Sequence, residues 1–360
     1  MSTHCHRSWS NGKLQDLVFF QRGFDITKAE QKEGDIPVIS SSGVTSYHNE
    51  AKVGGPGIII GRKGSLGTVH YSEGPYWPHD TTLWSKDIKG NNPRYIYYFL
   101  KTLGLERFDV GNSNPTLNRN HIHDMVIKIP AKDIQQNIVE ILTPYNDLIE
   151  NNRRRIQLLE EAARLLYQEW FVRLRFPGHE HTKIVDGVPE GWESLPLIEA
   201  LELQRGFDLP LKNIEPGDVP VYGSTGIIAY HNVSKAKGPG IVTGRSGSLG
   251  VVQFVLNDYW PHNTALWVKS LKKVTPLFAL QLLRNLKLEQ YNGGVSVPTL
   301  DRKVVHRIQI IIPPPKIMND FESVSSDSYA LMMNLSQQNT NLIKARDLLL
   351  PRLMNGVIPV

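Results

Sequence analysis

The chain has 360 residues, enough for two or three domains of ordinary size. Hydrophobic residues make up 40% of it and charged residues 21%, which is typical of globular proteins and excludes a disordered or fibrous chain. The formal net charge of +5 permits a nucleic-acid partner without requiring one. There is no apolar run long enough for a membrane span and no signal-peptide core. The single cysteine, Cys5, excludes an intramolecular disulfide and any multi-cysteine metal site, so a cytoplasmic location is expected.

The chain contains two copies of the same sequence segment. Gln21-Arg22-Gly23-Phe24-Asp25 recurs as Gln204-Arg205-Gly206-Phe207-Asp208, an offset of 183 residues. At this offset, 33 of the 64 residues from 21 to 84 are identical in the second copy, whereas chance gives roughly one identity in sixteen positions. The chain is therefore an internal duplication, and two similar bodies related by a pseudo-two-fold axis are expected.

The first part of each copy is predicted to be a compact domain of mixed α and β structure. Short apolar runs bounded by Gly or Pro indicate strands with tight turns, and apolar residues at helical spacing indicate one helix per copy. The expected elements are strands at 57–60, 67–71 and 125–130 with a helix at 94–105, and in the second copy a strand at 308–313 with a helix at 276–288.

The second part of each copy carries a heptad pattern, in which seam residues recur at alternating intervals of four and three. The seam residues are Ile138, Leu142, Tyr145, Ile149, Asn152, Ile156, Leu159, Ala163, Leu166 and Trp170, aligned with Phe321, Met332, Leu335, Leu342, Leu349 and Leu353. Because a long helix with one apolar stripe is unstable alone, we expect the two helices to pair within the chain. The pseudo-two-fold axis reverses one helix relative to the other, so we expect the pair to be antiparallel. Pairing with another molecule is the alternative. Asn152 and Asn339 are expected to fix the register, and Pro144 to kink the first helix or to start a new one capped by Thr143.

The expected fold is α+β, with two similar mixed α/β domains separated by a pair of long antiparallel coiled-coil helices. The expected boundaries are a first domain at 1–130, a long helix at 131–177, a linker at 178–191, a second domain at 192–313 and a second long helix at 314–360. This arrangement would let the two domains contact two patches of a long ligand at a fixed separation.

Four segments in each copy carry candidate ligand-binding side chains. An Arg at the tip of a Gly-rich loop fits guanine or phosphate, and His with Asp or Asn after a rigid Pro fits base edges. The alternatives are a solvated turn, a buried Trp with a hydrogen-bonded His, and helix N-caps at Thr116 and Thr299. The candidates are Gln21, Arg22, Arg62, Lys63, Ser65, His79, Asp80, Thr116 and Arg119, and in the second copy Gln204, Arg205, Arg245, Ser246, Ser248, His262, Asn263, Thr299 and Arg302.

Signatures of catalysis are mostly absent from the sequence. The segment 61–67 is not a P-loop, and no Gly-x-Gly-x-x-Gly joins a strand to a helix. Asn114-Pro115 lacks the Pro-aromatic continuation of an amino-methyltransferase. The paired histidines, at 4 and 6, 121 and 123, and 179 and 181, have no third ligand in view, so no metal is expected.

The chain resembles the DNA-specificity subunits of type I restriction-modification systems along its full length. The resemblance rests on the order of the segments Ser41-Ser42-Gly43, Tyr47-His48-Asn49, Gly61-Arg62-x-Gly64-x-x-Gly67, Pro115 to Ile122, Gln135-Gln136, Ile149 to Arg153, Leu166 to Phe171 and Gly187 to Trp192. One departure is that Arg352-Leu353-Met354 stands where the first helix has Glu169-Trp170-Phe171, so the helices are not expected to offer equal surfaces to partners.

This resemblance implies two target recognition domains that each read half of a split DNA sequence. It implies that the helices set the spacing and bind two methyltransferase subunits, with two restriction and translocase subunits where the system also cleaves DNA. The chain itself is then not an enzyme. S-adenosylmethionine, ATP and Mg²⁺ would be bound by the partners, and no cofactor by this chain.

Since the two domains are about half identical and the pseudo-two-fold axis inverts one against the other, we expect similar, inverted half-sites and so a nearly palindromic split site. Differences between its halves are expected to trace to Lys63 and Ser246, Asp80 and Asn263, His70 and Gln253, and Ser113-Asn114 and Ser296-Val297. Two other functions remain open at this point, a stand-alone DNA methyltransferase or nuclease and a bivalent DNA-binding regulator without enzyme partners.

Overall fold

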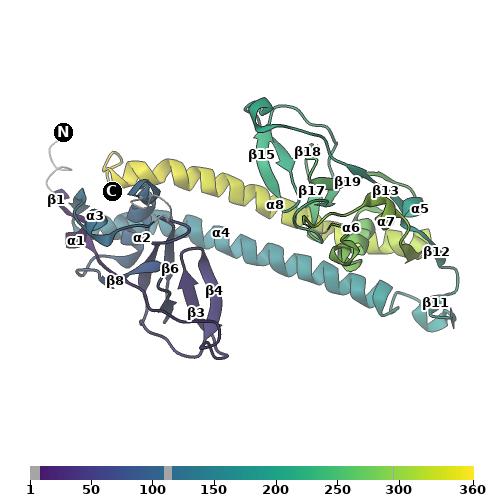
Figure 1. The fold of residues 1–360 in the computed structure, drawn as a ribbon, viewed down its shortest axis with the longest axis horizontal. Coiled ribbons are helices and arrows are strands. Elements are labelled where there is room, and N and C mark those ends of the chain that lie inside the picture. The colour runs from purple at the N-terminus through teal and green to yellow at the C-terminus, as the bar shows by residue number, and fades with distance from the viewer. Residues whose placement is uncertain (1–8, 109–115, 295) are drawn as a thin grey trace. The chain divides into compact units, whose positions relative to one another are not determined.

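The computed structural model describes residues 9–108, 116–294 and 296–360 and divides into two compact units (Figure 1). The first unit comprises Met1–Asn151 and Gln338–Val360, and the second comprises Asn152–Gln337. Each unit therefore holds one mixed domain, part of the helix that follows it, and part of the long helix of the other copy.

The domain of the first unit is built from three small sheets. A four-stranded antiparallel sheet has the order β2-β8-β5-β6, a three-stranded sheet the order β4-β3-β7, and β1 pairs with β9. The elements are β1 (Trp9–Lys13), α1 (Leu14–Leu17), β2 (Phe19–Arg22), β3 (Ile36–Ser40), β4 (Gly43–His48), β5 (Gly57–Gly61), β6 (Val69–Ser72), β7 (Trp77–Pro78), β8 (Thr82–Asp87), α2 (Pro93–Lys101), a 3₁₀ turn (Leu105–Phe108), α3 (Arg119–His123) and β9 (Val126–Pro130).

The domain of the second unit repeats this topology. Its sheets have the orders β13-β19-β16-β17, β15-β14-β18 and β12-β20. The elements are β12 (Glu193–Pro196), α5 (Leu197–Ala200), β13 (Leu201–Arg205), β14 (Val219–Tyr222), β15 (Ile227–His231), β16 (Gly240–Gly244), β17 (Val252–Val255), β18 (Trp260–Pro261), β19 (Ala265–Leu271), α6 (Pro276–Asn285), α7 (Arg302–His306) and β20 (Gln309–Ile312), with 3₁₀ turns at Leu211–Asn213 and Leu288–Tyr291. The predicted strands and helices are thus confirmed in both copies.

The segment between the copies is more ordered than the polar linker predicted at 178–191. It contains a short 3₁₀ turn (His179–His181) and a two-stranded hairpin of β10 (Ile184–Val185) and β11 (Val188–Pro189). Asp186 and Gly187 form its turn with φ of 52° and 80°, the left-handed conformations that a tight hairpin of this kind requires.

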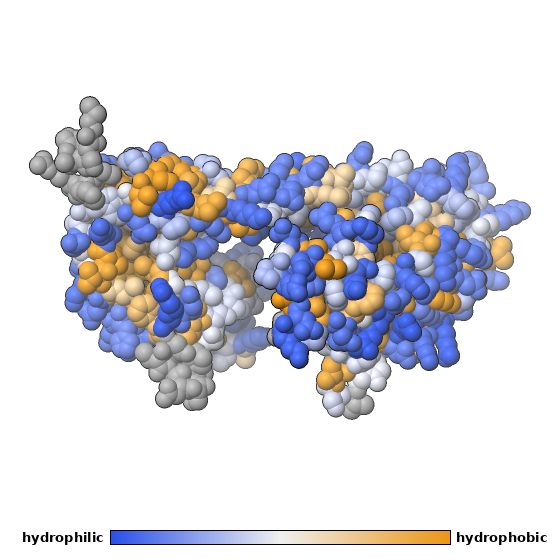
Figure 2. Space-filling model, turned by 90° about the horizontal axis from the view of Figure 1, so that it is seen from above, coloured by the Kyte–Doolittle hydropathy of each residue, from blue (hydrophilic) through white to orange (hydrophobic). Residues whose placement is uncertain are grey.

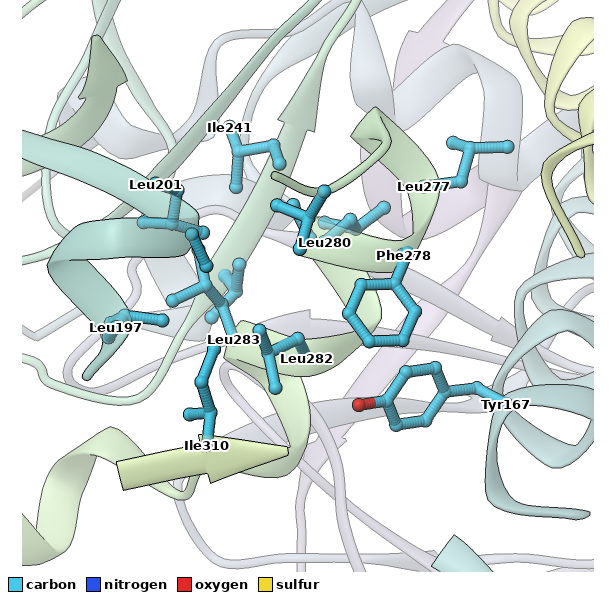
Figure 3. Close-up of a cluster of buried hydrophobic side chains, with 14 of the residues drawn as sticks. Tyr167, Leu197, Leu201, Ile241, Leu277, Phe278, Leu280, Leu282, Leu283 and Ile310 are labelled. Atoms are coloured by element: carbon cyan, nitrogen blue, oxygen red, sulfur yellow. The ribbon is translucent and has the colours of Figure 1, made fainter. Parts of the chain in front are cut away.

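One amphipathic helix in each domain packs its apolar face on the four-stranded sheet. Both α2 and α6 begin with Pro at the first helical position, where the missing N–H costs no hydrogen bond. In the second unit Phe278 and neighbouring residues of α6 form a core with Tyr167 of the long helix (Figure 3). The helix face therefore joins the domain to the helical part of the same unit.

The two long helices are α4 (Lys132–Tyr167), which continues as a π-helical turn (Gln168–Val172), and α8 (Pro315–Met354). In the first unit the Asn339 amide lies 3.3 Å from the Ile149 carbonyl, while Leu353 further along α8 shares a core with Ile138. In the second unit Phe321 near the start of α8 contacts Trp170 at the end of α4. The helix segments of each unit therefore lie side by side and antiparallel, as predicted (Figure 1).

The heptad residues occupy the seam as expected. Every seam residue named above is buried or half-buried, and the two asparagines, Asn152 and Asn339, are buried. Because the seam is covered from within the chain, the alternative in which each helix pairs with another molecule does not hold.

Of the two alternatives considered for Pro144, a kink or the start of a new helix, the second is wrong. The helix α4 runs through this residue, and Thr143 lies inside it, with its hydroxyl 3.4 Å from that of Tyr98. Proline removes one backbone hydrogen bond. The buried side chains of Leu142 and Ile149 on either side keep the helix attached to the core.

Candidate nucleic-acid interface

The second unit has an open cleft of about 660 Å³ in which most of its predicted site residues meet. They come from the end of β13, the end of β16 and the segment that leads into α7, which are far apart in the sequence. The lining residues are Gln204, Arg205, Gly206, Phe207, Asp208, Arg245, Leu266, Thr299, Leu300, Asp301 and Arg302.

In the first unit the equivalent residues form an arginine cluster. Nη2 of Arg22 lies 3.0 Å from Oδ2 of Asp80 and 3.5 Å from Oδ2 of Asp25. Nη1 of Arg62 donates to the main-chain carbonyl of Asp80 at 3.2 Å. Burial, and then the positive charge of Arg22, lowers the pKa of Arg62, while Asp80 opposes this. Two guanidinium groups are thus held close enough to repel each other.

The second unit repeats the cluster with different partners. Nη2 of Arg205 lies 3.3 Å from Oδ1 of Asp208, and the Asn263 side-chain amide donates to the same carboxylate. Nε of Arg245 donates to the Asn263 carbonyl at 2.9 Å. Burial and the charge of Arg205 lower the pKa of Arg245. An anion or a guanine edge placed between the two arginines would relieve their repulsion and accept their hydrogen bonds.

A backbone contact explains the glycine of the repeated Gln-Arg-Gly-Phe-Asp segment. A Cβ atom on Gly23 would collide with the carbonyl oxygens of Pro78 and His79, and one on Gly206 with those of Pro261 and His262. The Phe24 amide donates to the Pro78 carbonyl at 2.8 Å. Glycine therefore lets the two chain segments touch, which places Arg22 beside Asp80.

The Gly-rich loop positions its arginine differently from the sequence prediction. Arg62 is not at the tip: its amide donates to the Thr81 carbonyl at 2.8 Å, and its carbonyl accepts from the Leu117 amide at 2.9 Å. Both main-chain groups are used by neighbouring segments, so the residue is fixed at the base of the loop. The tip is formed by Gly64, with φ of 75°, and exposed Ser65.

The Trp-Pro-His segments combine buried and accessible groups. Trp77 and Trp260 are buried, as in the alternative left open by the sequence. Nδ1 of His79 lies 3.0 Å from the Thr81 hydroxyl, and His262 makes the same contact with Thr264. The histidines therefore have internal partners, and their contact with DNA stays a prediction.

The alternative in which Thr116 and Thr299 cap helices does not hold. The N-caps of α3 and α7 are Asn118 and Asp301, whose side chains accept from main-chain amides, and not Thr116 and Thr299. The two threonines instead form β-bridges with Lys63 and Ser246 at the Gly-rich loops. This pairing holds each threonine against the Gly-rich loop that follows Arg62 or Arg245.

The remaining candidates lie around the clusters. Arg302 lines the cleft of the second unit as the first residue of α7, and Arg119 is exposed at the first residue of α3. Gln21 and Gln204 are half-buried on β2 and β13, and Ser248 is exposed on its loop.

Sequence reasoning missed the two aspartates that pair with the arginines, Asp25 and Asp208. Their signal was present, because each ends the repeated Gln-Arg-Gly-Phe-Asp segment. An acidic residue beside an arginine gave no reason to expect an ion pair until the chain turn between them was known.

Some earlier predictions fall outside residues 9–108, 116–294 and 296–360. Cys5, His4, His6, Ser113, Asn114 and Pro115 lie there. Within the described ranges, no group of three or more His, Cys, Asp or Glu residues could hold a metal ion. In the same part of the chain, no helix has the length and apolar character to cross a membrane.

The family model for the type I restriction modification DNA specificity domain matches residues 6–161 and 189–324. The type I restriction enzyme MjaIX specificity subunit of Methanocaldococcus jannaschii is 25% identical over 300 residues, which cover 74% of this chain and 69% of that protein. The HindI specificity subunit of Haemophilus influenzae is 22% identical over 330 residues, covering 68% and 71%. The crystal structure of a type I S subunit from M. genitalium has a similar fold, with a TM-score of 0.61 at 16% identity over 98% of this chain and 96% of that one.

Proposed function

Because the chain belongs to the family of type I restriction-modification DNA specificity proteins, we propose that each of its domains reads one half of a split DNA site through its arginine cluster. The observation that carries this proposal is the duplication of the cluster: Arg22 and Arg62 in one domain, Arg205 and Arg245 in the other. Sequence specificity needs donors that reach base edges, and arginine supplies them in the geometry that guanine accepts.

The two half-sites are similar and inverted under this proposal. The domains share 33 of 64 residues over 21–84 and its counterpart, and the segments that build the clusters are nearly unchanged. A methylome determined with the gene present and with it deleted gives the site directly. Two unrelated half-sites would contradict the near-palindrome while leaving DNA recognition intact.

The test of the clusters is Arg62→Ala and Arg245→Ala in the assembled methyltransferase complex. A base contact predicts a loss of about 1–3 kcal/mol of specific binding, with relaxed preference at one base pair. A phosphate contact predicts equal weakening on all sequences and a salt slope smaller by about one. Exposed Arg175, which lies outside the cleft, is the control, and Arg175→Ala should change neither quantity. Unchanged DNA binding in both cluster variants would remove the arginines from the interface.

We assign the spacing between the half-sites to the long helices. Both α4 and α8 contribute residues to both units. Seven residues inserted into each helix add about 10 Å of helix. That length corresponds to about three base pairs. A spacer that stays the same length in the methylome of this variant would contradict the assignment.

Partner binding is assigned to the outer faces of the same helices. Apolar residues are exposed there at equivalent positions of the two copies: Leu148 and Leu331, Leu165 and Leu348, and Ile141 and Val324. On the face drawn in Figure 2, hydrophobic residues form separate patches within a mostly hydrophilic surface. Two equivalent sets fit two methyltransferase subunits, which would bring S-adenosylmethionine, with ATP and Mg²⁺ on added restriction subunits. Leu148→Glu with Leu331→Glu should then abolish co-purification of the methyltransferase.

A further inference from the structure

The two arginine clusters differ at one position that, in the first domain, contacts both arginines. Residue 80 is aspartate in the first domain, and its counterpart, residue 263, is asparagine. In both domains the main-chain carbonyl of this residue accepts from the loop arginine. The backbone is therefore conserved here, and only the side-chain charge changes.

In the first domain this side chain holds Arg22. The Asp80 carboxylate lies 3.0 Å from Nη2 of Arg22 through one oxygen and 3.1 Å from Nδ1 of His79 through the other. The Asp80 side chain is only 17% exposed, whereas Asp25, the second acid near Arg22, is 82% exposed and 3.5 Å away. Since exposed ion pairs hold side chains weakly, Asp80 is the main restraint on Arg22.

In the second domain this restraint is missing. The Asn263 amide donates to Asp208 and carries no charge to hold a guanidinium. Among the described residues, the ion pair of Arg205 is with Asp208, whose side chain is 70% exposed and is shared with Asn263. Arg205 is thus the freer of the two arginines.

The difference has a consequence for DNA reading. Guanine accepts two hydrogen bonds from arginine in one fixed plane, so a guanidinium held in place discriminates bases better than a free one. Phosphate oxygens accept from many directions and carry no base information. A carboxylate beside the arginine also reduces its attraction for phosphate, which further favours the base contact.

We propose that Asp80 is a positioning residue that makes Arg22 discriminate between bases, and that Asn263 leaves Arg205 to a less selective, mainly phosphate contact. The two half-sites are then read with unequal strictness at equivalent positions. The inference rests on the proposed function, because it requires that the arginine clusters face DNA.

The experiment uses the assembled methyltransferase complex and DNA libraries in which each base pair of one half-site is randomised in turn. Asp80→Asn should lower the discrimination at one base pair of the first half-site by about five-fold or more, the lower range for a bidentate contact. Binding at low salt should be retained, because the variant removes a negative charge. Asn263→Asp should raise discrimination at the equivalent pair of the second half-site.

Asp25→Asn is the matched control, since it removes the same charge near Arg22 without removing the close restraint. Equal effects of Asp25→Asn and Asp80→Asn would show that base discrimination depends only on net charge, which would overturn the proposal. The absence of any effect of Asp80→Asn would also overturn it. Arg22→Ala distinguishes failure of the proposed DNA site from failure of the positioning role of Asp80. If it leaves DNA binding and base preference unchanged, the proposed DNA site itself fails. If it abolishes discrimination while Asp80→Asn does not, only the positioning role fails.

Discussion

The helix end that packs in the second unit is aromatic, whereas the equivalent end in the first unit is aliphatic. Tyr167, Trp170 and Phe171 surround Phe321 in the second unit, with ring centroids 5.1–6.1 Å apart. At the matching positions the first unit has Leu350, Leu353, Met354 and Ile138, which are buried together. Equivalent positions of the two cores are thus buried or half-buried in both units, while the side chains that fill them differ in shape. The aromatic residues at the end of the first long helix therefore pack into the core of the second unit.

Among variants that compare the two cores, the largest loss of stability is expected from Phe321→Ala. Phe321 is fully buried against three rings, so its truncation should cost about 3–5 kcal/mol of unfolding free energy. Ile138→Ala removes fewer atoms than Phe321→Ala and should cost less, though still about 2 kcal/mol or more. Hydrogen exchange of strand amides in each unit measures the two losses separately.

The control for this pair is Val324→Ala, one turn further along α8. Val324 is exposed, so its truncation should change stability by less than about 0.5 kcal/mol. If Ile138→Ala weakened its unit more than Phe321→Ala weakened the other, the aromatic cluster would not be the stronger core.

The second comparison concerns a contact that the two units share. Gly23→Ala and Gly206→Ala each force a Cβ atom into two backbone carbonyls, so both should destabilise by about 1–3 kcal/mol and by similar amounts. Thermal unfolding measures the loss. Gly54→Ala, where no atom lies near the added Cβ, should leave stability nearly unchanged. Unequal losses at Gly23 and Gly206 would show that one of the two segments can move apart.

These contrasts explain how far the sequence could predict the fold. Apolar periodicity is local, so the strand Gly57–Gly61 and the heptad helices could be predicted from it. The duplication predicted equivalent sites, because residues that repeat at one offset occupy equivalent places in the two units. Pairing followed from the need of each helix to bury its stripe, and the antiparallel direction from the pseudo-two-fold relation of the two copies.

The rest depends on contacts between distant residues. Arg62 was placed at a loop tip because its bonds to Thr81 and Leu117 cannot be seen in a local pattern. Pro144 argued for a helix break, since local propensity does not include the packing of Leu142 and Ile149. The pairing of Arg22 with Asp80 likewise joins residues whose approach is set by the fold.

The smallest expected effect is a pH dependence to which one equivalent histidine in each unit contributes. Nε2 of His123 accepts from the Phe20 amide at 2.9 Å, and Nε2 of His306 accepts from the Leu203 amide at the same distance. Burial, followed by the charge of Arg119 or Arg302, lowers the pKa of both histidines. Each is therefore neutral in the fold and must lose its hydrogen bond to become charged.

The lowered pKa fixes the sign of the effect. The unfolded chain binds protons more readily below about pH 6.5, the ordinary pKa of histidine, so the stabilisation is full above that pH and is lost as the pH falls through the lowered values. We expect Tm to fall between pH 7 and pH 5. His123 is buried and lies against the rings of Phe19 and Phe20, so it should contribute more to the fall than the half-buried His306.

Replacing both histidines by glutamine keeps an acceptor and removes the titration. His123→Gln with His306→Gln should therefore reduce the dependence of Tm on pH over this range, and His262, whose pKa burial also lowers, should carry a remainder. His121→Gln, at an exposed neighbour, should not reduce it. Because carboxylates with ordinary pKa values near 4 titrate mostly below this window, a double variant that still lost the same stability would place the acid sensitivity on other groups and remove the difference between the two units.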